Sequence, residues 1–257
     1  MMNLIDTHAH LTFTELAGSI DDVLDRSRAA GCSKWITVGT DAEHNEQVVK
    51  LAQKYDNLYA ALGIHPHYAS EYKETHLQRL VELVGSGKVV AIGETGLDFH
   101  YNFSKQDAQR DLFKRLLEIA SLTRLPVIIH SRNALDETMR LIETVADKTT
   151  KFVFHCWSGT IEETRAIIDK GFYISFTGII TFKNAELARE CVKTVPLDKM
   201  MIETDCPYMS PEPMRKQKIN EPALMIHTAK KIAELKGIDL ETLDEQLAVN
   251  TKEFFNI

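Results

Sequence analysis

The 257-residue chain is poor in cysteine, and the spacing of its cysteines argues against a disulfide framework or a zinc knuckle. The scattered cysteines, which form no Cys-x-x-Cys pair, are Cys32, Cys156, Cys191 and Cys206. Long apolar runs are also missing, since no segment approaches the roughly 18 uncharged apolar residues of a membrane span. The chain does not open with a basic stretch followed by an apolar one, as a secretory signal does. We therefore expect a cytoplasmic protein with no membrane partner.

An excess of positive charge is absent as well. The chain has 30 lysine and arginine residues against 37 aspartate and glutamate residues, a net charge of -7. This balance argues against a protein that coats nucleic acid by neutralising its phosphates. It is still compatible with a small or end-on anionic substrate, because bound divalent cations would add local positive charge. Nothing in the sequence indicates an obligate protein partner.

Short β-rich runs alternate with longer helical patterns along the whole chain. The expected strands cover residues 4–10, 34–38, 58–64, 89–93, 126–130, 151–155, 172–176 and 200–204. The expected helices cover residues 19–31, 41–55, 74–85, 105–124, 134–146, 160–170 and 184–194, with two or three more after residue 222. Strands that are apolar on both faces and separated by helices are typical of parallel sheets.

This alternation predicts an α/β fold, a single (β/α)8 TIM-type barrel domain over residues 1–257 with additional C-terminal helices. A doubly wound open sheet is the structural alternative. It is disfavoured because neither a Gly-x-Gly-x-x-Gly turn nor a phosphate loop follows the first strand. The residues found there are His8 and His10.

His8 and His10 indicate a metal-binding site. Side chains alternate along a strand, so these two imidazoles project the same way and can chelate one cation. Alone, the pair would suit a bland reading, a tag remnant or two surface histidines, as well as it suits a metal site. Four other apolar runs end in a potential ligand, however, and in a parallel barrel the functional residues gather at these strand ends. The predicted metal ligands are His8, His10, Glu94, His130, His155 and Asp205.

Each ligand has an expected role. We expect Glu94 to bridge two cations, His130 and His155 to supply nitrogens to the second, and Asp205 to accept the proton that turns water into hydroxide. Taken singly, these residues also suit a salt bridge or a hydrogen-bonded core histidine. Glu203 is expected to be interior scaffold, with a catalytic part as the less favoured reading. Mixed imidazole and carboxylate ligands leave the metals open among zinc, manganese, magnesium, iron and nickel.

Three further residues are candidates for substrate binding. His65 and His67 share a face across Pro66, and His65 favours substrate contact over loop packing, whereas the two readings are balanced for His67. Arg132 follows His130 by two residues and can fork onto a phosphate, although a plain surface arginine is an equal reading.

Five spaced motifs resemble those of the TatD family of metal-dependent hydrolases, within the amidohydrolase-like barrels. They are Asp6-Thr7-His8-Ala9-His10, Gly63-Ile64-His65-Pro66, Gly93-Glu94-Thr95-Gly96-Leu97-Asp98, His155-Cys156-Trp157-Ser158-Gly159 and Glu203-Thr204-Asp205-Cys206-Pro207-Tyr208. The resemblance implies a (β/α) barrel, two divalent metals at the residues named above, and deoxyribonuclease or related phosphoesterase activity. Trp157 stands where the family has Phe, and the segment 215–222 lacks the family's glycine and is one residue longer, which bears on substrate preference.

The sequence therefore predicts a metal-dependent deoxyribonuclease or phosphodiesterase that trims DNA from an end. An enzyme that hydrolyses a small amide, lactone or nucleobase is the alternative, because the same metals polarise a carbonyl group. A metal-binding regulatory protein without turnover is a third reading, and the presence of all six ligand positions counts against it.

Overall fold

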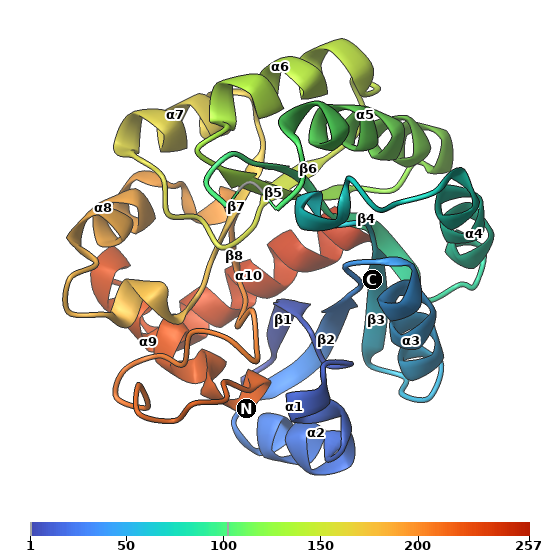
Figure 1. The fold of residues 1–257 in the computed structure, drawn as a ribbon. Helices are drawn as coiled ribbons and strands as arrows, with labels where there is room; N and C mark the ends of the chain where they lie inside the picture. Colours follow the sequence, from blue (N-terminus) through green and yellow to red (C-terminus); the bar gives the residue numbers. More distant parts are fainter. Residues whose placement is uncertain (1, 102) are drawn as a thin grey trace. The chain divides into compact units, whose positions relative to one another are not determined.

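The structure is a computed structural model that describes residues 2–101 and 103–257. The described chain divides into two compact units. The first unit comprises residues 2–37 and 155–257, and the second comprises residues 38–154. Strands and helices alternate through both units (Figure 1).

The first unit contains the chain's first two and last two strands. Its elements are β1 (Leu4–Ala9), α1 (Thr14–Ala17), α2 (Ile20–Ala29), β2 (Cys32–Val38), α7 (Ile161–Asp169), β7 (Tyr173–Phe176), η2 (Gly178–Thr181), α8 (Glu186–Thr194), η3 (Leu197–Lys199), β8 (Met200–Ile202), η4 (Pro222–Leu224), α9 (Met225–Lys236) and α10 (Leu240–Phe255). β1 pairs with β2 and β7 with β8, both parallel. Helix α10 lies against β1 and β8 (Figure 1).

The second unit contains the four central strands. Its elements are α3 (Ala42–Ala52), β3 (Leu58–Leu62), η1 (Pro66–Tyr68), α4 (Glu74–Val84), β4 (Val89–Asp98), α5 (Gln106–Thr123), β5 (Val127–Arg132), α6 (Leu135–Val145) and β6 (Phe152–Phe154). β3 pairs with β4, β4 with β5, and β5 with β6, always in parallel. Parallel pairing explains why each crossover carries a helix, since the chain must return to the same end of the sheet.

The burial of the strands explains why their sequences are largely apolar. Every residue of β1 and β4 is buried, as expected of strands covered on both faces. The helices instead bury one face: in α5 the buried side chains include Leu112, Leu116 and Ala120, at helical spacing. Helix α3 begins where the Asp41 side chain accepts a hydrogen bond from the backbone N–H of His44.

The expected (β/α)8 TIM-type fold is confirmed, with α9 and α10 as the additional C-terminal helices. The expectation of one domain over residues 1–257 stays a prediction. Within the part of the chain that the structure describes, no helix has both the length and the apolar character needed to cross a membrane.

Several strand boundaries differ from the sequence prediction. The largest difference is in β4, which continues to Asp98 instead of ending at Gly93 before a loop. Gly93 and Gly96 are typical of a loop, but Thr95 to Asp98 pair with β5, and this pairing extends the strand. Conversely, β3 ends at Leu62 and β8 at Ile202, each two residues earlier than expected. The short helix α1 was not predicted.

Candidate functional site

In the first unit, His8 and His10 lie together at the end of β1. Their Nε2 atoms are 3.3 Å apart. Asp205 Oδ1 lies 3.7 Å from Nε2 of His8 and 3.4 Å from Nε2 of His10. Two backbone hydrogen bonds hold the strands in this relation: Asp205 donates its N–H to the carbonyl of His8, and His10 donates to that of Cys206. The predicted chelating pair and the predicted base are therefore one group of side chains.

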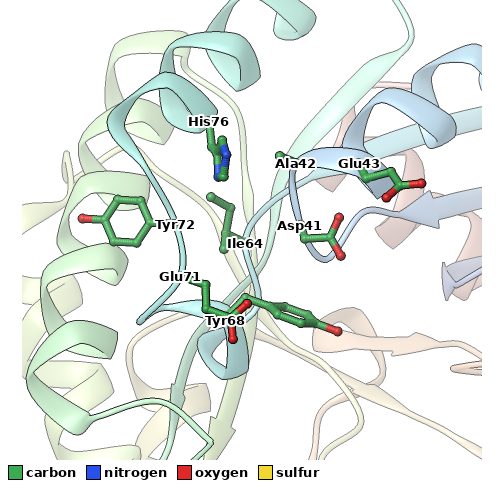
Figure 2. Close-up of a pocket in the computed structure, with 8 residues that line it drawn as sticks. All are labelled: Asp41, Ala42, Glu43, Ile64, Tyr68, Glu71, Tyr72 and His76. Carbon is green, nitrogen blue, oxygen red and sulfur yellow. The ribbon is translucent and has the colours of Figure 1, made fainter.

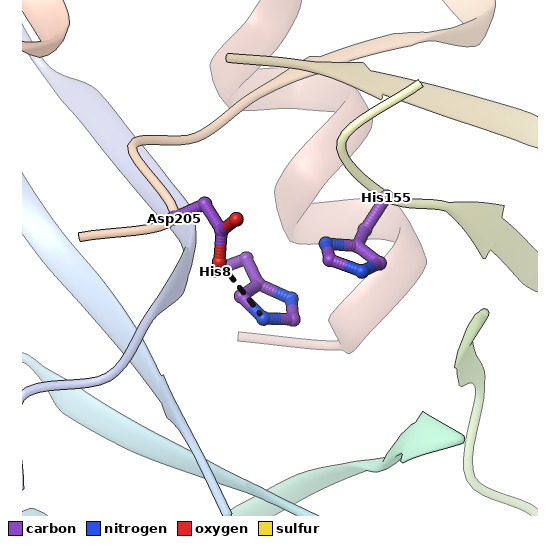
Figure 3. Close-up of side chains that lie close together, drawn as sticks. All are labelled: His8, His155 and Asp205. Carbon is purple, nitrogen blue, oxygen red and sulfur yellow. Dashed lines mark ion pairs between the residues drawn. The ribbon is translucent and has the colours of Figure 1, made fainter. Parts of the chain in front are cut away.

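His155 joins the same group. Its ring stacks on that of His8, with centroids 4.1 Å apart and planes 10° apart. One ligand atom each from His8, His155 and Asp205 lies within 4.8 Å of the others, and Figure 3 shows the three side chains close together. The sequence had assigned His155 to the ion of His130 instead. His130 belongs to the other unit, so that pairing stays a prediction.

Asp6 holds the ends of β1 and β8 in place. The fully buried carboxylate accepts hydrogen bonds from the Thr204 backbone at 3.0 Å, the Thr204 hydroxyl at 2.6 Å and the His8 backbone at 3.3 Å. Burial raises the pKa of Asp6 to about 7, although these hydrogen bonds act in the opposite direction. Asp6 therefore positions the backbone on which His8 and Asp205 stand.

Glu203 has the interior, supporting place that the sequence suggested. Its Oε1 accepts a hydrogen bond from the backbone N–H of Cys156 at 2.6 Å and lies 3.5 Å from Nδ1 of His155. The side chain is buried. It fixes the segment that carries His155.

The Asp205 carboxyl has a pKa below its ordinary value. Burial acts to raise this pKa, but the hydrogen bond from His10 and the electrostatic effect of His8, His10 and His155 outweigh it. The carboxylate is therefore ionised at neutral pH, as a metal ligand or a general base must be.

In the second unit, Glu94 lies between two histidines. Its Oε1 is 3.2 Å from Nε2 of His65 and 2.8 Å from Nδ1 of His130. One ligand atom from each of the three lies within 4.8 Å of the others. Burial lowers the pKa of His65 to about 4, against the opposite effect of Glu94, so its imidazole is neutral and offers a lone pair. His65, predicted as a substrate contact, thus has a position equally suited to a metal ligand.

Asp98 is a member of this group that the sequence reasoning missed. Its Oδ2 accepts hydrogen bonds from Nε2 of His130 at 3.1 Å and Nε2 of His67 at 2.9 Å. Burial acts to raise the pKa of Asp98, but hydrogen bonds from His130, the Tyr101 backbone and His67 outweigh it and lower the pKa. The signal was available in principle: once β4 is extended to residue 98, Asp98 lies on the same face as the predicted ligand Glu94.

Gly96 allows β4 and β5 to approach at this point. It pairs with His130 and has a φ of +144°. A Cβ atom built on Gly96 would lie 1.9 Å from the carbonyl oxygen of His130, which no side chain tolerates. The glycine that made this segment resemble a loop is thus a requirement of the strand pairing that presents His130.

His67 and Arg132, the other predicted substrate contacts, lie beside the second group. The rings of His65 and His67 have centroids 4.2 Å apart, in line with a shared face. The Arg132 guanidinium lies 4.5 Å from the centroid of the Tyr101 ring. Arg132 is exposed, and it forms no ion pair with any carboxylate in the described ranges. Its charge is available to an anion, while the substrate role of all three residues stays a prediction.

A cavity of about 260 Å³ lies elsewhere in the second unit, at the start of α3 (Figure 2). Its lining includes Asp41, Glu43, Ile64, Tyr68, Glu71 and Tyr72. None of the predicted ligands lines it. The candidate chemistry lies in the two imidazole and carboxylate groups and not in this cavity.

The first group has the spacing that a divalent cation requires. Ligand atoms about 2.0–2.2 Å from a tetrahedral ion lie about 3.3–3.6 Å from one another. The three distances that join Nε2 of His8, Nε2 of His10 and Oδ1 of Asp205 are 3.3, 3.4 and 3.7 Å. Buried imidazoles beside carboxylates are the donors that zinc, manganese, iron and nickel accept.

Comparisons with known proteins give matches along nearly the whole chain. A family model described as TatD related DNase matches residues 5–256. The chain is 36% identical to an uncharacterized metal-dependent hydrolase, YabD, of Bacillus subtilis, and 36% identical to the 3'-5' ssDNA/RNA exonuclease TatD of Shigella flexneri, with 99% of each chain covered in both cases.

Solved structures give the same result. The structure of YjjV, a TatD homologue from Escherichia coli, has a TM-score of 0.92 at 31% identity, covering 99% of this chain and 98% of the other. A TatD family hydrolase from Entamoeba histolytica has a TM-score of 0.91 at 26% identity with the same coverage. The similarity thus extends over the full chain.

Proposed function

Because the chain belongs to the TatD related DNase family, we propose that it is a divalent-metal-dependent hydrolase that removes nucleotides from an end of single-stranded DNA or RNA. The observation that carries this proposal is the presence of the two imidazole and carboxylate groups in a chain that matches nuclease relatives along its full length. The direction of trimming that we propose, from the 3' end, is that of the 3'-5' exonucleases among those relatives.

We assign two divalent ions to the six ligands predicted from the sequence. His8 and His10 would bind one ion, His130 and His155 the other, and Glu94 would bridge them, with Asp205 as the sixth ligand beside the attacking water. Bound ions would polarise the phosphate, stabilise its developing negative charge and lower the pKa of a water molecule. Their identity is left open among zinc, manganese, magnesium, iron and nickel.

The side chains then have distinct tasks. Asp205, ionised at neutral pH, accepts the proton of the attacking water as the new P–O bond forms. His65, His67 and Arg132 hold the phosphate and orient it toward that water. The bond to the departing nucleotide oxygen breaks, and this oxygen is protonated from solvent.

Recognition of a chain end agrees with the charge of the protein. With a net charge of -7, the chain offers little for a long phosphate backbone to follow. Affinity should depend on the few nucleotides nearest the scissile bond, and its salt dependence should be weak. The cytoplasmic location expected from the sequence remains part of the proposal.

A substrate panel tests the proposal. The purified protein, supplied separately with magnesium, manganese or zinc, is incubated with linear single-stranded oligonucleotides labelled at either end, a closed single-stranded circle, and cyclic amides. We expect a descending ladder from the 5'-labelled oligonucleotide and an intact circle. The Asp205→Asn variant, purified in parallel, controls for contaminating nucleases. Cleavage of the circle at the linear rate would refute trimming from an end.

Hydrolysis of amides far faster than phosphodiesters would instead favour the alternative, a metal-dependent amidohydrolase. This alternative has less support, because the relatives whose names state a substrate are 3'-5' ssDNA/RNA exonucleases.

A further inference from the structure

Two aromatic rings are exposed in the segment between β4 and α5. The Phe103 side chain is 69% exposed and that of Tyr101 is 47% exposed. Their rings stack on each other, with centroids 5.6 Å apart and planes 16° apart. Adjacent exposed apolar rings are unfavourable in water, and such patches mark sites where a ligand or partner binds.

The segment that carries these rings is held at both ends. At its start, Asp98 Oδ1 accepts the backbone N–H groups of His100 and Tyr101, each at 2.9 Å. At its end, the Ser104 hydroxyl donates to the carbonyl of His67 at 2.7 Å and accepts the N–H of Ser70 at 2.9 Å. Tyr101 and Ser104, which follows Phe103, are therefore each held in place, so a ligand that contacts the two rings loses little affinity to ordering them.

The exposed rings adjoin the group of His65, Glu94 and His130. The Phe103 ring lies 4.8 Å from that of His67, which in turn lies 4.2 Å from the ring of His65. One imidazole thus separates Phe103 from a candidate metal ligand. The exposed Arg132 guanidinium lies over the Tyr101 ring and adds positive charge at the same place.

We propose that Tyr101 and Phe103 form a stacking surface for a base of single-stranded nucleic acid, with Arg132 contacting a neighbouring phosphate. The proposal rests on the proposed function and names how that site holds its substrate. Aromatic rings beside a cationic side chain are the means by which proteins bind single strands with little dependence on sequence. In a duplex both faces of an internal base are covered by its neighbours, so the surface favours single strands.

Binding is measured first, without divalent ion, so that the result does not depend on hydrolysis. Fluorescence anisotropy of a labelled single-stranded oligonucleotide in EDTA is compared for the wild type, Phe103→Ala and Tyr101→Ala. Leu122→Ala is the matched control, because Leu122 is a large apolar side chain in the same unit, on α5, and is 84% exposed. Phe103→Tyr keeps an aromatic ring and should bind the oligonucleotide as tightly as the wild type does.

We expect Phe103→Ala to raise the dissociation constant about 5- to 100-fold, the usual effect of losing one stacked base. An oligonucleotide with abasic terminal nucleotides should bind the wild type more weakly by a similar factor and should be insensitive to Phe103→Ala. Equal affinity of Phe103→Ala and Leu122→Ala for the normal oligonucleotide would overturn the proposal. So would the same loss with the abasic strand, because the ring would then act on something other than the base.

Kinetic measurements on the same variants distinguish a failure of the stacking surface from a failure of the proposed function. With divalent ion added, Phe103→Ala should raise KM for oligonucleotides. The same variant should hydrolyse dimethyl phosphate, a diester without a base, at the wild-type rate. A wild type that binds single strands but cleaves no phosphodiester would refute the proposed function while leaving the stacking surface intact. Normal cleavage with unchanged KM in Phe103→Ala would refute the stacking surface alone.

Discussion

Nε2 of His130 lies 3.1 Å from Oδ2 of Asp98, while Nδ1 of the same ring lies 2.8 Å from Oε1 of Glu94. The imidazole is therefore held from both sides by carboxylates that stand on one strand, β4. A carboxylate on one ring nitrogen fixes the tautomer and orientation of a metal-binding histidine and increases the basicity of the other nitrogen. Asp98 is thus a positioning residue for His130.

Replacing Asp98 by Asn should weaken metal binding about 10- to 100-fold, the usual effect of losing such a carboxylate partner. The substitution preserves the shape of the side chain, so the fold should survive, as circular dichroism can verify. Metal affinity is measured by titration calorimetry. Asp107→Asn is the control, because Asp107 is an exposed carboxylate at the start of α5. Equal affinities of the two variants would show that Asp98 does not support a ligand.

Replacing Asp205 by Asn should lower turnover by roughly 10²–10⁴-fold, the worth of a positioned general base. The amide retains an oxygen near His8 and His10 but cannot take up the proton. The measurement is kcat on a single-stranded oligonucleotide at saturating metal. Near-normal turnover there would mean that a different group accepts the proton.

Replacing Glu94 by Ala should lower the metal content from two ions per chain to one or fewer, because the proposed bridge is lost. Inductively coupled plasma mass spectrometry of the purified variant gives the content directly. Glu82→Ala is a suitable control, since this glutamate pairs with Arg79 on the surface of α4. Full occupancy of both ions in the Glu94 variant would contradict the bridging role.

Replacing Glu137 by Gln should destabilise the protein by about 0.5–1 kcal/mol at pH 7, the range of a well-oriented, partly exposed ion pair. Glu137 Oε1 lies 2.8 Å from Nε of Arg110 and Oε2 lies 3.0 Å from Nη2, a two-pronged contact that links α5 and α6. The hydrogen bond from Arg110 is the main cause that lowers the pKa of Glu137 below its ordinary 4.5.

Because this pKa is lower in the folded state, the stabilisation is present above pH 4.5 and is lost as the pH falls below that value. Urea unfolding at pH 7 and at pH 3 gives the two free energies. The difference between wild type and Glu137→Gln should shrink at pH 3. A difference of the same size at both pH values would show that the ion pair does not cause it.

The sequence by itself determined the kind of fold and the kind of chemistry. Apolar runs separated by helical patterns are enough to predict a parallel α/β barrel, because strands covered on both faces and one-sided helices leave distinct periodicities. His8 and His10 predicted a chelating pair, because alternation along a strand needs only neighbouring residues. The structure brings these two together with Asp205, as expected of strand ends in this fold.

The tertiary structure decided what depends on contacts between distant residues. The extent of β4 follows from its pairing with β5, so Asp98 became part of the site only when that register was known. The stacking of His155 on His8 was not predicted, because strand order does not specify side-chain direction. The sequence did not single out Tyr101 and Phe103, since exposure and ring stacking have no signature in a single sequence.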